Sequence, residues 1–338
     1  MALDSGRGIR QLRGLPGSVM QVVFSRDGKR LAALSDNWWT GVWNRDTGRL
    51  VRLCYVPRGQ FTGNADLAFS PDARSLAVSA GNTATLWNVE SGAARRWQLP
   101  WGLADAIAFP DAEHLMLMRV EVRDGSRPPD SQAPPMSYPR VCVIRNLLGR
   151  NPKEPVKTII DLNWGVKEIE ASPDGTHFLV DGRGGADELN LSRQVRAYQV
   201  DGTFVSEILP KIPLDPANGK FTFDPTGRLL IHYPKDQPVL FELPSLRFMG
   251  PTPITLISGV SQDAQLWVGY AFDEGGRPQI YDRDGKVLLD RIPGAVDTVH
   301  FSPDLDGRYL IWGNRLGAVC VADLVEVRRR LTEIGLGW

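Results

Sequence analysis

Residues of the types that catalyse reactions or bind metals are few in this chain, and they do not gather into known motifs. Four His and three Cys occur among 338 residues, and no pair of them has the spacing of a zinc site. Asp304 and Asp306 lie close together, as in a calcium loop, but Gly313 stands where that loop needs a bidentate Glu. GRGGAD, from residue 182, fits neither the Walker A nor the dinucleotide pattern. We therefore predict hairpin and loop roles for these segments, with no cofactor and no metal.

The composition limits the partners and the compartment. Lys plus Arg and Asp plus Glu number 39 each, so there is no basic field, and we expect no nucleic-acid and no membrane partner. Cys54, Cys142 and Cys320 each lie in a short apolar run, which predicts buried free thiols. The N-terminal residues lack the apolar stretch of a signal peptide. These features together predict a cytoplasmic protein.

One phrase recurs along the whole chain: an apolar residue followed by Ser, any residue, Asp and Gly. Its clearest copies are FSPDA from residue 69 and FSPDLDG from residue 301. The apolar anchors are Phe24, Phe69, Phe109, Ala171, Phe223, Val260 and Phe301. A period of about 40 to 45 residues, lengthened by insertions, is typical of a repeat architecture.

Each repeat contains the pattern of four short strands. In the first repeat these are VMQVVF, RLAALS, GVWNR and LVRLCYV. Turns rich in Asp and Gly between alternating apolar strands indicate antiparallel hairpins. Because stacking such sheets around an axis covers both faces of each, the sequence predicts an all-β, seven-bladed β-propeller of four-stranded antiparallel blades.

The two ends of the chain complement each other. Residues 8–13 have the pattern of a fourth strand without three strands before it, and the last repeat, 296–324, lacks its fourth strand. We therefore expect residues 8–13 to pair with residues 318–323 in the last blade. This pairing closes a single ring that spans residues 1–324.

Residues 325–338 predict a short C-terminal amphipathic helix and tail packed on the propeller. One helical face carries Leu324, Val327, Leu331 and Ile334, with Asp323 as the N-cap and Gly335 as the C-terminal cap. The opposite face carries Arg328, Arg329 and Arg330 beside Glu326 and Glu333. Mixed charges favour a solvated face over an Arg cluster for a partner.

FSRDGKRLAALS…VWNRDTGR and FSPDARSLAVS…LWNVESG resemble WD40 repeats, and the resemblance covers essentially the whole chain. WD40 blades usually add a Gly-His pair, whose His joins an Asp, a Ser or Thr and the Trp in a buried hydrogen-bond network. Trp43 and Trp87 are present, but no His follows a Gly at that place. We therefore expect apolar packing and turns to hold the blades together more than this network does.

The ending DLVEVRRRLTEIGLGW resembles the close of WD40 arrays in large bacterial signalling proteins, where the array often follows a serine/threonine kinase or another effector domain. No kinase motif occurs in this chain. The resemblance implies a sensor or scaffold that is a fragment of such a protein or a partner to its effector domain. We expect the chain to be a monomer. Its implied function is non-enzymatic binding of a protein or peptide.

The predicted recognition surface is the upper face, which carries the connections between second and third strands and those leading into first strands. Two long insertions fall between second and third strands, at 121–140 and 181–194. Exposed Trp and Arg are enriched at binding hot spots. The candidate partner-binding residues are Trp38, Trp39, Arg58, Phe61, Trp101, Trp164 and Arg183. For any single Trp, covering a loop or a blade is the alternative role.

An enzyme is the alternative function. Propellers of the lactonase type hold a metal at the central channel with Glu, Asn and Asp from several blades. Acids stand at the starts of four predicted first strands, namely Asp66, Asp105, Glu168 and Asp297. They could assist hydrolysis only if three or more held one ion. Because acidic rings are also common in non-catalytic WD40 propellers, we expect no catalytic residue.

Overall fold

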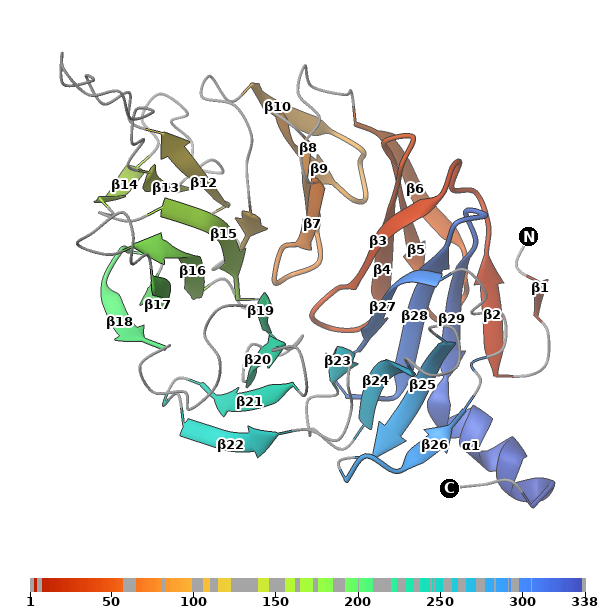
Figure 1. Cartoon of the computed structure of the whole chain (residues 1–338). Coiled ribbons are helices and arrows are strands. Elements are labelled where there is room, and N and C mark those ends of the chain that lie inside the picture. The colour runs from red at the N-terminus through yellow and green to blue at the C-terminus, as the bar shows by residue number, and fades with distance from the viewer. Residues whose placement is uncertain are drawn as a thin grey trace, which may run out of the picture.

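The chain forms a succession of β-sheets followed by one short helix (Figure 1). The sheets follow one another in chain order, from the red N-terminal part through green to the blue C-terminal part. The computed structural model describes residues 3–4, 8–56, 65–80, 83–98, 106–109, 115–122, 139–145, 156–161, 165–172, 176–184, 192–199, 201–208, 220–223, 229–233, 238–243, 245, 247–251, 257–260, 266–271, 277–282, 284–290, 292, 298–304 and 306–335.

Six of the sheets have four strands each, and in each of them consecutive strands pair antiparallel. Sheet 1 contains β3 (Val19–Phe24), β4 (Arg30–Ser35), β5 (Trp39–Asn44) and β6 (Leu50–Tyr55). Sheet 2 contains β7 (Ala65–Phe69), β8 (Ser75–Ala80), β9 (Thr83–Asn88) and β10 (Ala94–Gln98). Sheet 3 contains β11 (Ala106–Ala108), β12 (Met116–Val122), β13 (Pro139–Arg145) and β14 (Val156–Asp161). Sheet 4 contains β15 (Gly165–Ala171), β16 (His177–Gly184), β17 (Ser192–Gln199) and β18 (Phe204–Glu207). Sheet 5 contains β19 (Lys220–Phe223), β20 (Leu229–Tyr233), β21 (Val239–Glu242) and β22 (Arg247–Pro251). Sheet 6 contains β23 (Ile257–Val260), β24 (Leu266–Ala271), β25 (Arg277–Asp282) and β26 (Val287–Leu289).

The remaining sheet, sheet 7, combines the two ends of the chain. It contains β27 (Thr298–Pro303), β28 (Tyr309–Asn314), β29 (Val319–Asp323), β2 (Ile9–Leu12) and β1 (Leu3–Asp4). Ile9 pairs with Ala322 and Leu12 with Val319, so the predicted pairing of the chain ends is confirmed. The prediction of four strands per sheet is correct for six sheets and wrong for this one. In this sheet β2 is the fourth strand, and β1 pairs with its outer edge as a fifth strand.

The turns between third and fourth strands explain a large part of the repeat pattern. Gly48, Gly92, Gly202 and Gly285 each have a positive φ in this turn, between 66° and 90°. Glycine adopts this conformation without a steric penalty. In sheet 1 the side chain of Asn44 accepts a hydrogen bond from the Thr47 backbone N–H at 2.8 Å. The WN…G phrase is therefore a hairpin turn, as predicted.

Apolar packing between neighbouring sheets forms the core. Trp43 of sheet 1 is fully buried in one cluster with Leu12 and Ile311 of sheet 7. Its indole Nε1 donates a hydrogen bond to the backbone oxygen of Arg13 at 3.1 Å. Apolar packing around Trp43 agrees with our expectation for this blade, while the acceptance of its indole N–H by a backbone carbonyl was not predicted.

Two of the three cysteines are buried free thiols, as predicted. Burial, opposed by the nearby Arg52 charge, raises the pKa of Cys54 to about 11. Burial also raises the pKa of Cys320 to about 11. Both thiols therefore stay protonated and unreactive near neutral pH. The side chain of Cys142 lies outside the described residues.

The structure corrects the register of the last repeat. Phe24, Phe69, Ala171, Phe223 and Val260 each pair with the residue seven positions later. In sheet 7 this position belongs to Pro303, which pairs with Leu310, whereas Phe301 pairs with Trp312. The turn there is Asp-Leu-Asp-Gly rather than Ser-Pro-Asp. This register puts Gly307 (φ 67°) at the turn position that corresponds to Gly28 (φ 63°) of the first turn. The backbone is left-handed at this position, and glycine adopts that conformation without a steric penalty.

This register places Asp304 where the other described turns have Ser. In the first turn Ser25 donates its hydroxyl to Asp27 at 2.6 Å and accepts from the backbone N–H of Arg30. Asp304 keeps the second bond, from the N–H of Tyr309 at 2.8 Å. An ionised carboxylate cannot donate the first bond. Burial above all, then the charge of Asp306, raises the pKa of Asp304, while the Tyr309 N–H and Arg45 oppose this rise.

Asp304→Ser is expected to stabilise the fold by about 1 kcal/mol at neutral pH, because it removes a buried carboxylate and restores the hydroxyl–carboxylate bond. The folded-state pKa of Asp304 exceeds its usual value of 3.8. The wild-type disadvantage is therefore absent below that value and grows as the pH rises through the folded-state pKa. Urea unfolding of both proteins between about pH 4 and 7 measures this difference. A gap that stays constant with pH would contradict the assignment.

Helix α1 (Leu324–Glu333) begins at the predicted N-cap. The carboxylate of Asp323 accepts from the backbone N–H groups of Val325 and Glu326. Leu324 and Val327 are buried as predicted, but Ile334 is 69% exposed, so the predicted apolar face is wrong at its end. Gly335 follows with a positive φ, as expected of a C-terminal cap. Among the described residues, no helix has the length and apolar character needed to cross a membrane.

The basic residues of α1 are largely paired within the helix. Arg329 contacts Glu326 at 2.8 Å and also pairs with Glu333, while Arg330 pairs with Glu326. Hydrogen bonds from Arg329 and Arg330 lower the pKa of Glu326 to about 2. These pairs support the interpretation of this face as solvated helix surface.

Candidate interaction surface

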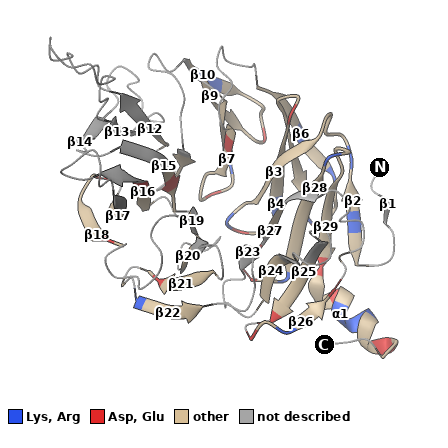
Figure 2. Cartoon of the chain, in the orientation of Figure 1, with Lys and Arg blue, Asp and Glu red and all other residues tan. Residues whose placement is uncertain are grey.

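The first strands of neighbouring sheets are joined by acidic side chains. Asp66 in β7 accepts hydrogen bonds from Gln21 Nε2 in β3 at 3.0 Å and from the backbone N–H of Ile107 in β11 at 3.1 Å. Glu170 in β15 accepts from the backbone N–H of Phe223 in β19 at 3.0 Å. Figure 2 shows acidic positions in red on both β7 and β15. These carboxylates therefore link adjacent sheets.

The acids that the sequence offered for a catalytic metal site are Asp66, Asp105, Glu168 and Asp297. Of the four candidates, only the side chain of Asp66 is described, and its two oxygens are held by the bonds above. The backbone of Glu168 lies in β15, while Asp105 and Asp297 lie outside the described residues. In the described part of the chain no three His, Cys, Asp or Glu side chains gather as a metal site would need. Asp66 therefore has a structural role in this arrangement.

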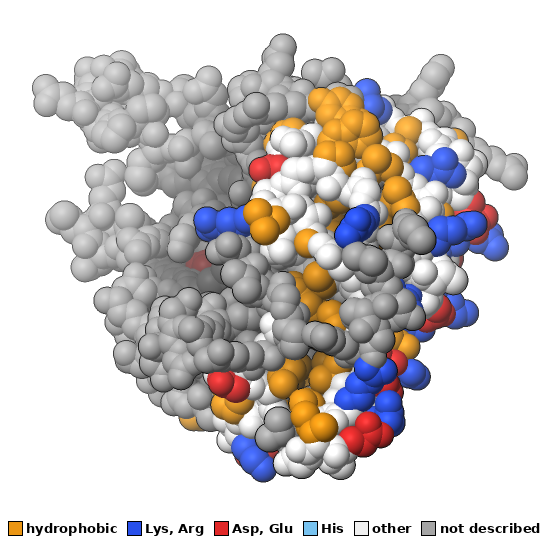
Figure 3. All heavy atoms as spheres, turned by 90° about the vertical axis from the view of Figure 1, so that its right-hand side faces the viewer, with side chains coloured by type: hydrophobic (Ala, Val, Ile, Leu, Met, Phe, Trp, Pro, Cys, Tyr) orange, Lys and Arg blue, Asp and Glu red, His pale blue; other side chains and the backbone are white. Residues whose placement is uncertain are grey.

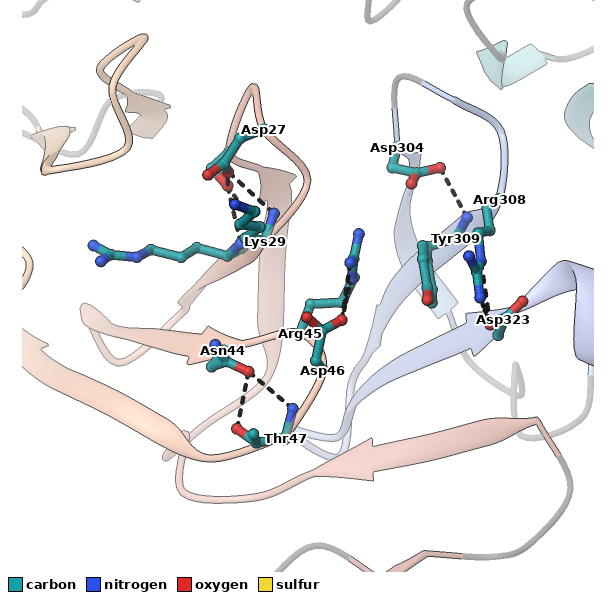
Figure 4. A network of polar contacts seen from close by, with 12 residues as sticks. Asp27, Lys29, Asn44, Arg45, Asp46, Thr47, Asp304, Arg308, Tyr309 and Asp323 are labelled. Carbon is teal, nitrogen blue, oxygen red and sulfur yellow. Dashed lines mark hydrogen bonds and ion pairs between the residues drawn. The ribbon is translucent and has the colours of Figure 1, made fainter.

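The junction of sheets 7 and 1 carries a polar network (Figure 4). The guanidinium carbon of Arg45 lies 4.1 Å from the ring centre of Tyr309, and that of Arg308 lies 5.0 Å from it. Arg45 pairs with Asp46 at 2.8 Å and Arg308 with Asp323 at 2.9 Å. Each cation has its own carboxylate, so the network joins the two sheets and does not offer a free charge to a ligand.

A second, more exposed surface lies at the opposite ends of these strands. The turn between β4 and β5 begins at Ser35, whose carbonyl accepts from the N–H of Trp38 at 2.9 Å. Trp38 has φ 64°, a conformation that costs a non-glycine residue about 1 kcal/mol or more. Its half-buried side chain packs against the core cluster that contains Val56 and Leu67. The side chain of Trp38 therefore packs against the core from a residue whose backbone conformation is strained.

The neighbouring Trp39 faces the other way. Its half-buried ring packs against the cluster that contains Leu15 and Val19. The ring centre of Tyr55, at the end of β6, lies 5.3 Å from that of Trp39, and Tyr55 is 49% exposed. The pair therefore presents an aromatic surface, and its Trp39 packs on the core cluster that sheets 7 and 1 share.

Two further loops lock onto this turn. The N–H of Ser18 donates to the carboxylate of Asp36, and the N–H of Asp36 donates to the Ser18 carbonyl, both at 2.9 Å. A Cβ on Gly17 would lie 2.4 Å from Asp36 Oδ1, and a Cβ on Gly317 would lie 2.4 Å from the Gly17 carbonyl oxygen. Only glycine permits these approaches. The connection 13–18 and the turns 35–39 and 314–318 therefore form one packed surface. Together with Tyr55, whose ring lies against Trp39, we call it the seam surface.

The most exposed apolar side chain of the described residues lies on the seam surface. Leu316 is 86% exposed at the tip of the turn between β28 and β29. The side chain of Asn314 fixes this turn, because it accepts from the N–H groups of Leu316 and Ala318 at 3.0 and 2.9 Å. Figure 3, which faces the right-hand side of Figure 1, shows hydrophobic side chains at the surface beside Lys and Arg. A group of exposed apolar side chains on one surface is a candidate for partner contact, and here Leu316 shares the seam surface with the Trp39–Tyr55 pair.

The structure brings only some of the predicted site residues together. Trp38 and Trp39 are neighbours in the seam surface, with the roles described above. Arg183 lies in β16 rather than in a loop, because the hairpin of β16 and β17 extends to Gly184. Its side chain is not described, and Arg58, Phe61, Trp101 and Trp164 lie outside the described residues.

Sequence reasoning missed Tyr55 and Leu316. Tyr55 read as the end of an apolar fourth strand, and only the fold places it against Trp39. Leu316 had one available signal, namely a large apolar residue between Arg315 and Gly317 in a turn. The two insertions lie where they were predicted, between second and third strands, but residues 123–138 and 185–191 fall outside the described residues.

Comparisons with known proteins agree with this architecture. No protein-family profile matches the chain. Among curated proteins, it is similar to apoptotic protease-activating factor 1 from Homo sapiens, 38% identical over 89 residues, and from Rattus norvegicus, 37% identical over 90 residues. These matches cover 25% of this chain and 7% of those proteins, so the chain spans only a small part of the length of these relatives.

Among solved structures, the β-propeller domain of Cps50 (Swd1) from Myceliophteria thermophila superposes with a TM-score of 0.64 at 13% sequence identity. The superposition covers 93% of this chain and 99% of that domain. At this identity the likeness shows the fold alone. Together with the four-stranded antiparallel sheets described above, the comparisons show that this chain has a WD40-like β-propeller fold.

Proposed function

We propose that this chain is a non-enzymatic scaffold or sensor module, which binds a protein or peptide through the upper face of a closed, seven-bladed propeller. In this proposal residues 1–324 form one ring, and residues 325–338 form a helix and tail packed on it. WD40 propellers typically act as protein-interaction scaffolds, which supports this function.

The observation that carries the proposal is the seam surface. Aromatic and apolar side chains are exposed there, at Tyr55 and Leu316, on turns fixed by hydrogen bonds and close glycine contacts. A rigid surface loses little conformational entropy when a partner binds. The predicted contributions of Arg58, Phe61, Trp101, Trp164 and Arg183 to the same face belong to this proposal.

We further propose that the module acts in the cytoplasm as a monomer, as a part of or a partner to a larger signalling protein such as a kinase. The similarity to short stretches of much longer curated proteins supports the idea that such repeats work inside larger proteins. The resemblance of residues 323–338 to the ends of bacterial WD40 arrays supports the kinase association.

Tyr55→Ala and Leu316→Asp are expected to reduce partner capture at least about tenfold. Leu316→Asp should change the free energy of unfolding by less than about 1 kcal/mol because Leu316 is 86% exposed, and Tyr55→Ala by about 1 to 2 kcal/mol because its half-exposed ring contacts Trp39. Quantitative pull-down from lysate of the source cells, with thermal unfolding of each variant, measures both effects. Trp101→Ala and Trp164→Ala extend the test to the other predicted residues.

Arg328→Ala is the matched control, because Arg328 is an exposed residue of α1, at the far end of β29 from the seam surface. This variant should capture as much partner as the wild-type chain. Equal capture by Tyr55→Ala, Leu316→Asp and the wild-type chain would contradict the use of this surface. A large loss of stability would show instead that these side chains are structural.

A further inference from the structure

The seam surface contains a path of contacts from sheet 7 to sheet 1, which runs through the backbone at Leu15 and the apolar cluster around its side chain. A Cβ on Gly317, the neighbour of Leu316, would lie 3.4 Å from the Leu15 carbonyl oxygen. Leu15 belongs to the cluster against which Trp39 packs, and Trp39 in turn contacts the ring of Tyr55. Leu316 and Tyr55 are therefore two exposed anchors on adjacent sheets, one at each end of this path.

Two cations flank this path. Arg13 directly follows β2, whose Leu12 pairs with Val319, so Arg13 lies beside the turn that carries Arg315. Both side chains are exposed. Neither guanidinium forms an ion pair or a hydrogen bond within the described part of the chain. This distinguishes them from Arg45, Arg308 and Arg329, each of which has a carboxylate partner.

One carboxylate, that of Asp36, lies on the same surface, and it accepts the backbone N–H of Ser18 rather than pairing with either Arg. Two guanidinium groups beside one carboxylate leave an excess of positive charge on this part of a chain whose net charge is zero. A guanidinium next to an apolar anchor recognises a carboxylate in two parallel hydrogen bonds, and aromatic side chains and Arg are the residue types enriched at binding hot spots.

We infer that the partner of the seam surface is an acidic peptide segment with apolar side chains, bound across sheets 7 and 1. Its apolar side chains contact Leu316 and the Trp39–Tyr55 pair, and its carboxylates pair with Arg13 and Arg315. This inference rests on the proposed function and adds to it the chemistry of the partner. Binding of this kind weakens as salt is added, because the ion pairs lie at an exposed surface.

Fluorescence anisotropy with two labelled peptides tests the inference on the full chain. One probe has a Leu-Phe pair flanked on each side by Glu and Asp, and the other has the same pair flanked by Lys and Arg. We expect the acidic probe to bind at least about tenfold more tightly than the basic one at low salt, with the difference reduced at about 0.3 M salt.

Three variants and one control locate the site. Arg13→Glu and Arg315→Glu should each weaken binding of the acidic probe about fivefold or more, and Leu316→Asp about tenfold or more. Arg328→Glu reverses the charge of an exposed Arg of α1, which forms no ion pair with any residue that the structure describes, and should leave binding unchanged. The main chain of Arg13 keeps its bond with Trp43 in the variant, and a thermal unfolding midpoint for each protein checks that the fold is retained.

The outcomes separate this inference from the proposed function. Absence of binding of the acidic probe up to about 1 mM, or equal binding of both probes, overturns the inference. Equal loss in Arg13→Glu and Arg328→Glu also overturns it, because the effect would then reflect net charge alone. If the basic probe binds instead and Leu316→Asp abolishes its binding, the surface is a peptide-binding face and only the acidic specificity is wrong.

Discussion

A variant that begins at Gly14 and so lacks residues 1–13 is expected to lose its cooperative unfolding transition at room temperature. The deletion removes β2, whose Leu12 is 1% exposed, and leaves β29 as an unpaired edge. It also removes the carbonyl of Arg13 that accepts from the Trp43 indole. The lost burial, ladder bonds and indole bond together are on the order of 5 kcal/mol, comparable to the total stability of many domains.

Thermal unfolding followed by near-ultraviolet circular dichroism measures this loss, since Trp43 is fully buried. A shorter deletion, of residues 1–7, is the matched control. It removes β1, which pairs with β2 through two residues only, and is expected to cost less than about 1 kcal/mol. Addition of a synthetic peptide of residues 1–16 should restore the transition of the longer deletion. Equal unfolding midpoints for the two deletions would show that β2 is not needed to complete sheet 7.

Gly41→Thr is expected to destabilise the chain by about 3 kcal/mol or more, although it makes the first repeat more like the second. Relative to Trp43 and Trp87, Gly41 occupies the position of Thr85. A Cβ on Gly41 would lie 2.2 Å from Cη2 of Trp43, which is fully buried and cannot move aside. Overpacking of this kind in a closed core is strongly unfavourable.

Urea unfolding of Gly41→Thr and Gly41→Ala measures the penalty, and Thr85→Val in sheet 2 is the control. The Thr85 hydroxyl is buried without a hydrogen-bond partner among the described residues, so its removal should be neutral or stabilising. A second substitution, Trp43→Leu, should cost less in the Gly41→Ala background than in the wild type, because the contact is then already strained. Additive effects of the two substitutions would contradict the proposed overlap.

Much of the fold could be predicted because its signals are local. The anchor phrase, the Gly of each third-to-fourth turn and the alternating apolar residues all act within one repeat. The complementary ends, residues 8–13 and 318–323, required only that a missing fourth strand be matched with a surplus one. The strand that was not predicted, β1, has two residues and no pattern of its own.

The last repeat shows where a local signal misleads. FSPD is a clear copy of the phrase by composition, but a turn forms where a left-handed residue is available, and that residue is Gly307. The register therefore lies two residues further along, and Asp304 occupies a Ser position. The position of Gly307 in the turn therefore agrees with the observed register, whereas the position of the Ser and Asp in FSPD does not.

The candidate site could be predicted only in part. Trp38 and Trp39 were named because exposed Trp is common at binding surfaces, yet their opposite orientations depend on the positive φ of Trp38. Asp66 was named as a possible metal ligand, yet in the fold it joins three sheets. The seam surface itself consists of three loops that are distant in sequence, and no pattern within one loop indicates the others.

The repeat, the strands within each repeat and the match between the two chain ends could be predicted from the residue pattern. Turn and strand preferences act between residues close in the chain, and each end carries a part of the same four-strand pattern. The register of the last turn, the need for Gly41 next to Trp43 and the meeting of Leu316, Trp39 and Tyr55 on one surface became visible only in three dimensions. These features depend on contacts between residues from different sheets or on opposite sides of a buried ring, where the shape and volume of the neighbours decide which arrangement fits.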